Sequence, residues 1–197
     1  MPGICIICNH LLEYFQDLMF LNKYFNRLLQ CPKCKSVFSK FPYWLSEINY
    51  EVLPTSDTLI SLINKIIKLY NKENISIYNM EINIPKIDES NIIINQKYDI
   101  LICSNIIEKI YEYYIYKLIL EMMNNSRILI IETLMVENNV INLINPEIGE
   151  NVSFLTSQSY KKIIINDNNR KKIKIIDIKK RYIIIYDNDI NIDFNIN

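Results

Sequence analysis

From about residue 46 onward, apolar and polar positions alternate in two different rhythms. The run LISLINKIIKLYN, residues 59–71, repeats its apolar positions at helical spacing. DILIC, residues 99–103, is a continuous apolar run typical of a strand buried on both faces. The pattern predicts strands over 48–53, 75–80, 92–94, 99–103 and 128–132. It predicts helices over 57–71, 105–124 and 157–166, the second with Asn105 as N-cap and Glu108 completing a capping box.

The order of these elements indicates an α/β fold. Strands that alternate with helices predict a parallel sheet with helices on both faces. KKIKIIDI and RYIIIYD, near the end of the chain, are separated only by Lys179-Lys180. That connection is too short for a crossover, so the two strands must be antiparallel. The tail from Ile190 to Ile196 also alternates, which fits an extra edge strand, a strand that needs a partner, or a frayed terminus.

Four of the five cysteines form two pairs near the N-terminus, Cys5-x2-Cys8 and Cys31-x2-Cys34. Each CxxC turn can point two thiolates at one ion, and two such turns close a tetrahedral site. We therefore predict a structural zinc site. The alternatives are two unrelated pairs of buried thiols or a redox dithiol. The connecting stretch LLEYFQDLMFLNKYFNRLLQ has helical periodicity and predicts a helix beside the metal.

The chain is therefore expected to hold a zinc-ribbon-like module, residues 1–45, and one larger domain, residues 46–197. Its 22 basic and 22 acidic residues cancel, which argues against a protein that generally coats nucleic acid. Neither a signal peptide nor an apolar run of membrane-spanning length is visible, so we expect a cytoplasmic protein. With two glycines, no alanine and abundant Ile, Asn and Lys, the composition is typical of an AT-rich genome, such as that of a large DNA virus or a reduced bacterium.

Several isolated features have both a structural and a functional interpretation. His10, the only histidine, is either a surface residue or a replacement metal ligand. Cys103 is either a buried thiol or a nucleophile. The YEYYIYK stretch, 111–117, is either core with a tyrosine-rich face or a partner interface. The basic stretch 166–181 is either a solvated turn or a phosphate contact.

Three segments resemble class I S-adenosylmethionine-dependent methyltransferases, in the branch with an N-terminal double-CxxC zinc module that includes sugar C-methyltransferases. KYDILICSNIIEKI, 97–110, is similar to the fourth strand and following turn of that family, with Lys109 where a histidine is usual. NNSRILIIETL, 124–134, is similar to the segment of the fifth strand, with Asn125 and Ser126 in place of two glycines. ENVSFLTSQSYKKII, 150–164, is similar to the segment before the last helix. The resemblance implies a Rossmann-like methyltransferase sheet, mostly parallel with an antiparallel last strand.

The resemblance also implies where a cofactor would bind. Residues 50–57 lie where the family has a strand ending in Gly-x-Gly-x-Gly, and here Leu53, Thr55 and Asp57 stand at the glycine positions. Glycines there allow positive φ angles and close approach of the backbone to the ligand. The cofactor contacts implied by the resemblance are Glu51, Thr55, Glu81 and Ser104, with Glu81 as the acid that pairs with the ribose hydroxyls. Glu108 or Lys109 would supply acid/base chemistry.

Two functions follow from this resemblance. In the first, the protein transfers a methyl group from S-adenosylmethionine to a small molecule such as a nucleotide-linked sugar. In the second, the loss of the glycines marks a catalytically inactive fold that acts as a scaffold for a protein partner, such as an active methyltransferase. Zinc is expected in both.

Overall fold

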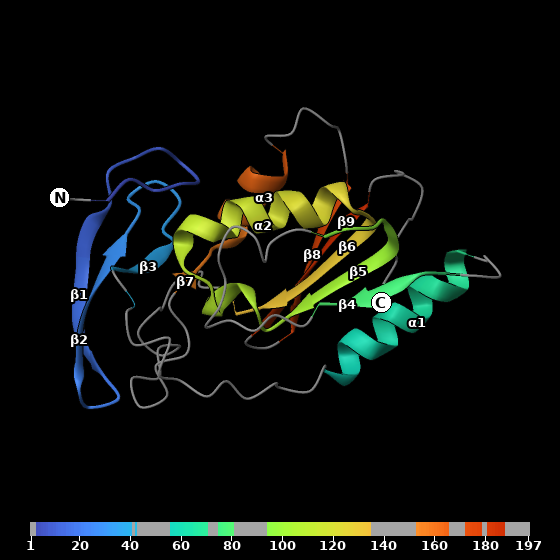
Figure 1. Cartoon of the computed structure of the whole chain (residues 1–197), viewed down its shortest axis with the longest axis horizontal. Coiled ribbons are helices and arrows are strands. Elements are labelled where there is room, and N and C mark those ends of the chain that lie inside the picture. The colour runs from blue at the N-terminus through green and yellow to red at the C-terminus, as the bar shows by residue number, and fades with distance from the viewer. Residues whose placement is uncertain are drawn as a thin grey trace.

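A computed structural model describes residues 3–40, 42, 56–70, 75–80, 94–134, 153–165, 172–178 and 181–187. The described residues form two sheets. A small antiparallel sheet that begins near the N-terminus lies at one end of the molecule, and a larger mixed sheet with its helices forms the rest (Figure 1).

The larger sheet has the strand order β4-β5-β6-β9-β8. Its parallel strands are β4 (Ile77–Asn79), β5 (Tyr98–Ser104) and β6 (Ser126–Thr133). The last two, β8 (Lys172–Ile178) and β9 (Arg181–Asp187), form an antiparallel pair, and β9 is also antiparallel to β6. The predicted α/β class and the antiparallel closing pair are confirmed.

Helices cover both faces of this sheet, as predicted. Helix α1 (Asp57–Tyr70) packs Leu59, Leu62 and Ile66 on one face, and α2 (Glu112–Asn124) and α3 (Ser157–Ile165) pack on the other. The apolar residues of β5 and β6 alternate between the two faces. The α1 side receives Ile100, Ile102, Ile128 and Ile130, and the α2 side receives Leu101, Cys103, Leu129 and Ile131. A strand buried on both faces needs this continuous apolar run.

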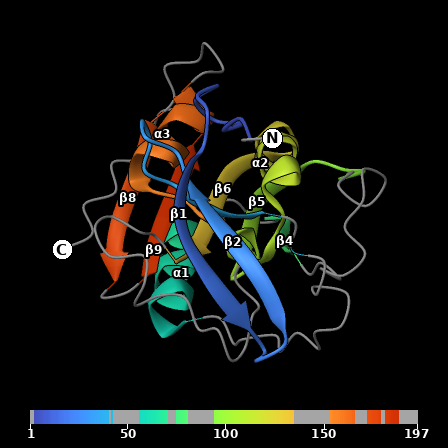
Figure 2. The same cartoon turned by 90° about the vertical axis from the view of Figure 1, so that its left-hand side faces the viewer.

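The smaller sheet has the order β1-β2-β3-β7, with β1 (Glu13–Phe20), β2 (Tyr24–Gln30), β3 (Val37–Lys40) and β7 (Ser153–Phe154). The helix predicted for residues 11–30 is wrong, because this stretch is the β1–β2 hairpin (Figure 2). Leu21 and Asn22 in its turn have positive φ angles of 52° and 53°, and Lys23 N donates to Phe20 O at 3.0 Å. Such a turn matches the twist of a hairpin.

The sequence of the hairpin resembles that of a helix because apolar side chains occupy both faces of the hairpin. Phe20, Tyr24 and Leu28 are buried in the interior of the small sheet. Met19 and Phe25 pair across the strands but are exposed by 50% and 54%. These outward apolar residues hide the period of two that identifies a strand.

The helix predicted for 105–124 is also shorter than expected. A short 3₁₀ helix, Ile107–Lys109, comes first, and α2 begins only at Glu112 with Tyr111 as its N-cap. Asn105 has a φ of 56°, which no N-cap adopts, so the predicted capping box does not form. The Glu108 side chain instead accepts a hydrogen bond from Thr133 Oγ1 at 3.0 Å.

Some predictions lie outside the described residues: the strand over 48–53, most of that over 92–94, the tail 190–196 and the domain boundary at 45/46. None of the helices among the described residues is long and apolar enough to span a bilayer.

Candidate metal centre and carboxyl-edge site

The two CxxC turns have the same backbone structure. Asn9 N donates to Cys5 O at 2.8 Å, and Lys35 N donates to Cys31 O at 2.9 Å. Each turn closes with a second bond, from Cys5 N to His10 O at 2.8 Å and from Cys31 N to Ser36 O at 2.9 Å. The β1–β2 hairpin joins one turn to the other and brings them face to face.

The four thiols brought together by these turns fit a zinc ion. The Sγ atoms of Cys5, Cys8, Cys31 and Cys34 all lie within 4.8 Å of one another, and all four residues are buried. Cys5 Sγ lies 3.8 Å from Cys34 Sγ. A tetrahedral site with Zn–S bonds of about 2.3 Å requires sulfurs about 3.8 Å apart. All four cysteines are free thiols, the state from which thiolate ligands form.

Electrostatics in this cluster also favour a cation. Hydrogen bonding to Cys34 and burial raise the pKa of Cys5, and the same hydrogen bond lowers the pKa of Cys34 to about 4. Burial raises the pKa of Cys8 to about 11. A divalent cation removes this conflict because it binds all four thiolates. His10 is exposed, and its Nδ1 lies 2.6 Å from Cys8 O, outside the thiol cluster.

A second group of polar side chains lies at the carboxyl ends of β5 and β6, on the α1 face. Ser104 Oγ donates to Glu132 Oε2 at 2.6 Å, and Asn105 Nδ2 donates to Ser104 Oγ at 3.0 Å. Glu132 is fully buried, and its Oε1 lies 3.9 Å from Arg181 Nη1 at the start of β9. This edge of a parallel sheet is where α/β proteins bind ligands.

Two buried oxygens of this group, Glu132 Oε1 and Asn105 Oδ1, accept no hydrogen bond from the described residues. Burying an acceptor without a donor costs about 1–3 kcal/mol. Asn105 also has the left-handed backbone noted above, φ 56°, which asparagine adopts more readily than other residues with a Cβ. Unpaired buried acceptors at the carboxyl end of a parallel strand are a feature that a bound ligand can explain.

On the opposite face of the sheet, Glu108 is the last acceptor in a separate, buried series of hydrogen bonds. Tyr160 OH donates to Thr133 Oγ1 at 3.3 Å, and Thr133 donates to Glu108. Burial raises the pKa of Glu108. Lys109 is also buried. Burial of Cys103 itself, together with the nearby Glu108 charge, raises the pKa of the Cys103 thiol, so that this thiol stays protonated. A protonated, buried Cys103 is a structural thiol rather than a nucleophile.

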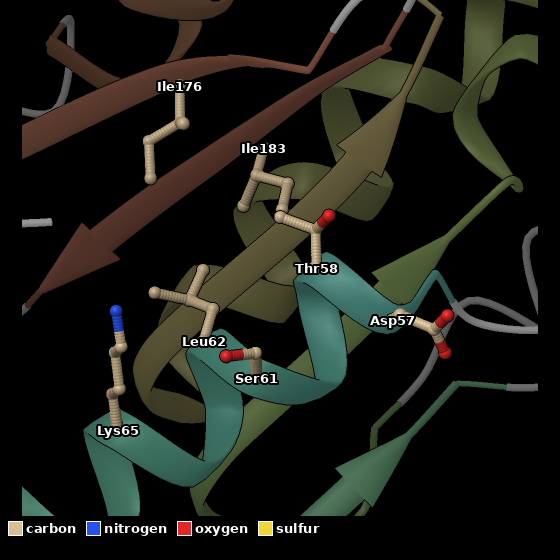
Figure 3. A pocket seen from close by; sticks show the side chains of 7 residues that line it. All are labelled: Asp57, Thr58, Ser61, Leu62, Lys65, Ile176 and Ile183. Atoms are coloured by element: carbon tan, nitrogen blue, oxygen red, sulfur yellow. The ribbon is translucent and has the colours of Figure 1, made fainter. Parts of the chain in front are cut away.

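A cavity of about 340 Å³ lies beside α1 (Figure 3). Thr58, Ser61 and Lys65 line it from the helix, with Asp57 and Leu62, and Ile176 and Ile183 line it from β8 and β9. Thr58 points toward Ile183. In the sheet Ile183 pairs with Glu132, so the cavity adjoins the strand position of the buried carboxylate.

No family model and no curated protein matches the chain. Among solved structures, one of LepI in complex with SAM is similar over 64% of this chain and 39% of the LepI chain, with a TM-score of 0.41 and 7% sequence identity. The chain thus corresponds to less than half the length of LepI.

Of the predicted site residues, the structure brings the four cysteines together and places Ser104 beside Glu132. Glu51, Thr55 and Glu81 lie outside the described residues. Glu108 and Lys109 lie in the 3₁₀ helix, buried beneath the edge. Glu132 and Arg181 are not among the predicted site residues. A signal for Glu132 existed, since it is the charged residue near the end of the apolar run ILIIE.

Proposed function

We propose that the α/β domain binds S-adenosylmethionine at the carboxyl edge of its parallel strands and transfers the methyl group to a small molecule such as a nucleotide-linked sugar. The observation that carries the proposal is the pair of buried acceptors without donors, Glu132 Oε1 and Asn105 Oδ1. A ligand with N–H or O–H groups at this edge would satisfy both. Residues 97–110 and 124–134, which resemble the methyltransferase family, supply β5, β6 and Ser104. This resemblance is the reason for proposing S-adenosylmethionine as the ligand.

The proposed site differs from the one implied by the resemblance in its acid. Glu108 lies on the α2 face, and its carboxylate already accepts a hydrogen bond from Thr133. Glu132 lies on the α1 face, next to Ser104, and its Oε1 accepts no hydrogen bond from the described residues, with Arg181 as a partner in an ion pair at 3.9 Å. We therefore assign to Glu132 the contact with the acceptor hydroxyl or amine. In the transfer, Glu132 would take the proton of that group, and bound S-adenosylmethionine would supply the methyl that the group accepts.

Calorimetry tests this function. The zinc-loaded chain is titrated with S-adenosylmethionine and with S-adenosylhomocysteine, and binding of both is expected. Ser104→Ala should weaken binding, because it removes a predicted contact and releases Glu132. Glu13→Gln, at an exposed position of β1, is the control. If neither ligand binds at millimolar concentration, the methyltransferase function is wrong.

The second function, an inactive scaffold that binds a protein partner, is favoured by a different observation. The outer face of the β1–β2 hairpin exposes Tyr14 by 62%, Met19 by 50% and Phe25 by 54%. Exposed aromatic residues and methionine are enriched at protein interfaces. Under this function, Phe25→Ser abolishes partner binding and no cofactor binds, so the same calorimetry separates the two functions.

A further inference from the structure

The first turn of α3 is interlocked with the second CxxC turn, about 120 residues away in sequence. Thr156 Oγ1, in the N-cap position, donates to Cys34 O at 2.7 Å, and Thr156 N donates to Ser36 Oγ at 3.2 Å. Ser36 Oγ lies 2.6 Å from Ser159 Oγ. All of these groups are buried, so the bonds are protected from competition with water.

Groups of α3 also contact the thiols themselves. Ser159 and Lys162 lie beside the thiols of Cys34 and Cys8: the Ser159 hydroxyl helps to lower the pKa of Cys34, and the Lys162 ammonium opposes the rise in the pKa of Cys8. Four thiolates around one Zn²⁺ leave two net negative charges in a buried place. A cation, a hydroxyl donor and the positive end of a helix dipole are the groups that stabilise such a charge. Helix α3 supplies all three.

The same helix also contacts the larger sheet. Tyr160, between Ser159 and Lys161, donates to Thr133 at the end of β6, and Thr133 donates to Glu108. Tyr160 is fully buried against α2 and the sheet. Residues 156–162 thus connect the thiol cluster to the carboxyl end of β6 within two turns of helix.

We propose that α3 is part of the metal centre: Ser159 and Lys162 hold the charge of the four-thiolate zinc site, and metal binding and the docking of α3 are one coupled step. Loss of zinc leaves like charges or crowded thiols beneath the first turn of α3, and the helix then detaches together with its Tyr160–Thr133 contact. This coupling does not depend on S-adenosylmethionine binding.

The zinc affinity of the full chain tests the first part of the proposal, the role of Ser159 and Lys162 at the thiolate site. Competition with a chelator is measured for the wild type and for Lys162→Met, Ser159→Ala and Lys161→Met. Loss of a group that holds a metal ligand typically weakens metal binding by about 10- to 100-fold. We expect at least about tenfold for Lys162→Met and Ser159→Ala. Lys161→Met is the matched control, because Lys161 is exposed on the same turn.

Lys162→Arg separates charge from packing, since it keeps the cation and should retain most of the affinity. Equal zinc affinity of Lys162→Met and Lys161→Met would overturn the assignment. So would a loss in Lys162→Arg as large as that in Lys162→Met.

Hydrogen exchange tests the second part of the proposal, the coupling between metal binding and the docking of α3. On removal of zinc from the reduced full chain, the amides of α3 should exchange at least about tenfold faster, while those of α1 and β5 keep their protection. An unchanged α3 would overturn the coupling. Equal loss of protection in α1 and α3 would also overturn it, because the metal would then stabilise the whole fold rather than the docking of this helix.

Discussion

Asn9 and Lys35 occupy the same position in two copies of one turn. Each follows the second cysteine of its pair, each donates its amide to the carbonyl of the first cysteine, and each has a positive φ, 55° at Asn9 and 60° at Lys35. Asparagine tolerates this left-handed conformation, but lysine adopts it at a cost of about 1–2 kcal/mol. The strain is retained because the turn aims Cys31 and Cys34 at the metal.

Lys35→Gly should therefore stabilise the zinc-loaded protein by about 1 kcal/mol, since glycine adopts a positive φ without strain. Urea unfolding at saturating zinc measures the change. Lys33→Gly is the control within the same turn, because Lys33 is exposed and has no positive φ. That variant should be neutral or destabilised by up to about 1 kcal/mol. The same change in both variants would contradict strain at Lys35.

Cys31→Ser should abolish stoichiometric zinc binding, whereas Cys103→Ala should leave about one zinc per chain. The reason is position: Cys31 belongs to the thiol cluster, and Cys103 lies in β5 facing α2. Metal analysis of the purified variants gives the ratio. Cys103→Ala creates a small cavity and costs about 1–2 kcal/mol, but its zinc content should not change. A wild-type content well below one equivalent would contradict the four-thiolate site.

Arg181 and Glu132 should be energetically coupled, although their nearest atoms are 3.9 Å apart. Glu132 is fully buried, so Arg181→Met leaves it in the interior without the one ion-pair partner that it has among the described residues. We expect a loss of about 2 kcal/mol, below the cost of breaking a fully buried pair because the Arg181 side chain is 30% exposed. Adding Glu132→Gln should recover most of it. Urea unfolding of the two single variants and the double variant measures the coupling, and strictly additive effects would exclude it.

The sequence predicted a structural feature correctly where one short pattern is sufficient to determine that feature. The CxxC spacing predicted the thiol cluster, because two tight turns can aim four thiolates at one point. The continuous apolar runs predicted β5 and β6, and the short connection at 179–180 predicted the antiparallel pair β8–β9. Each of these features has a short sequence pattern that predicts it.

The predictions from sequence failed where the structure depends on contacts that the local pattern does not show. Residues 11–30 read as a helix because Met19 and Phe25 are apolar yet exposed. The pairing of β7 with β3, and the contacts of Ser159 and Lys162 with the thiols, join segments more than 110 residues apart. The capping box at Asn105 failed because Glu108 finds Thr133 instead of a backbone amide. Local pattern carries no information about such partners.

Glu112 provides a prediction for pH. Burial raises its pKa from the ordinary value of 4.5 to about 7, and its Oε2 is buried without a partner among the described residues. Between these two values the folded chain holds a proton that the unfolded chain has lost. Stability therefore falls as pH rises through this window, and the loss is complete above about pH 7. The full shift corresponds to at most about 3 kcal/mol.

Glu112→Gln removes this titration while keeping the shape of the side chain. Relative to the wild type, the variant should be similar at pH 5 and more stable at pH 8 by about 1–3 kcal/mol, because only the wild type must ionise a carboxyl in an apolar place. Unfolding in urea at both pH values, each at saturating zinc, gives the difference, and comparison at the same pH cancels the pH dependence of the thiols. A gain that is equal at the two pH values would show that Glu112 stays ionised in the folded protein, and that the effect comes from packing.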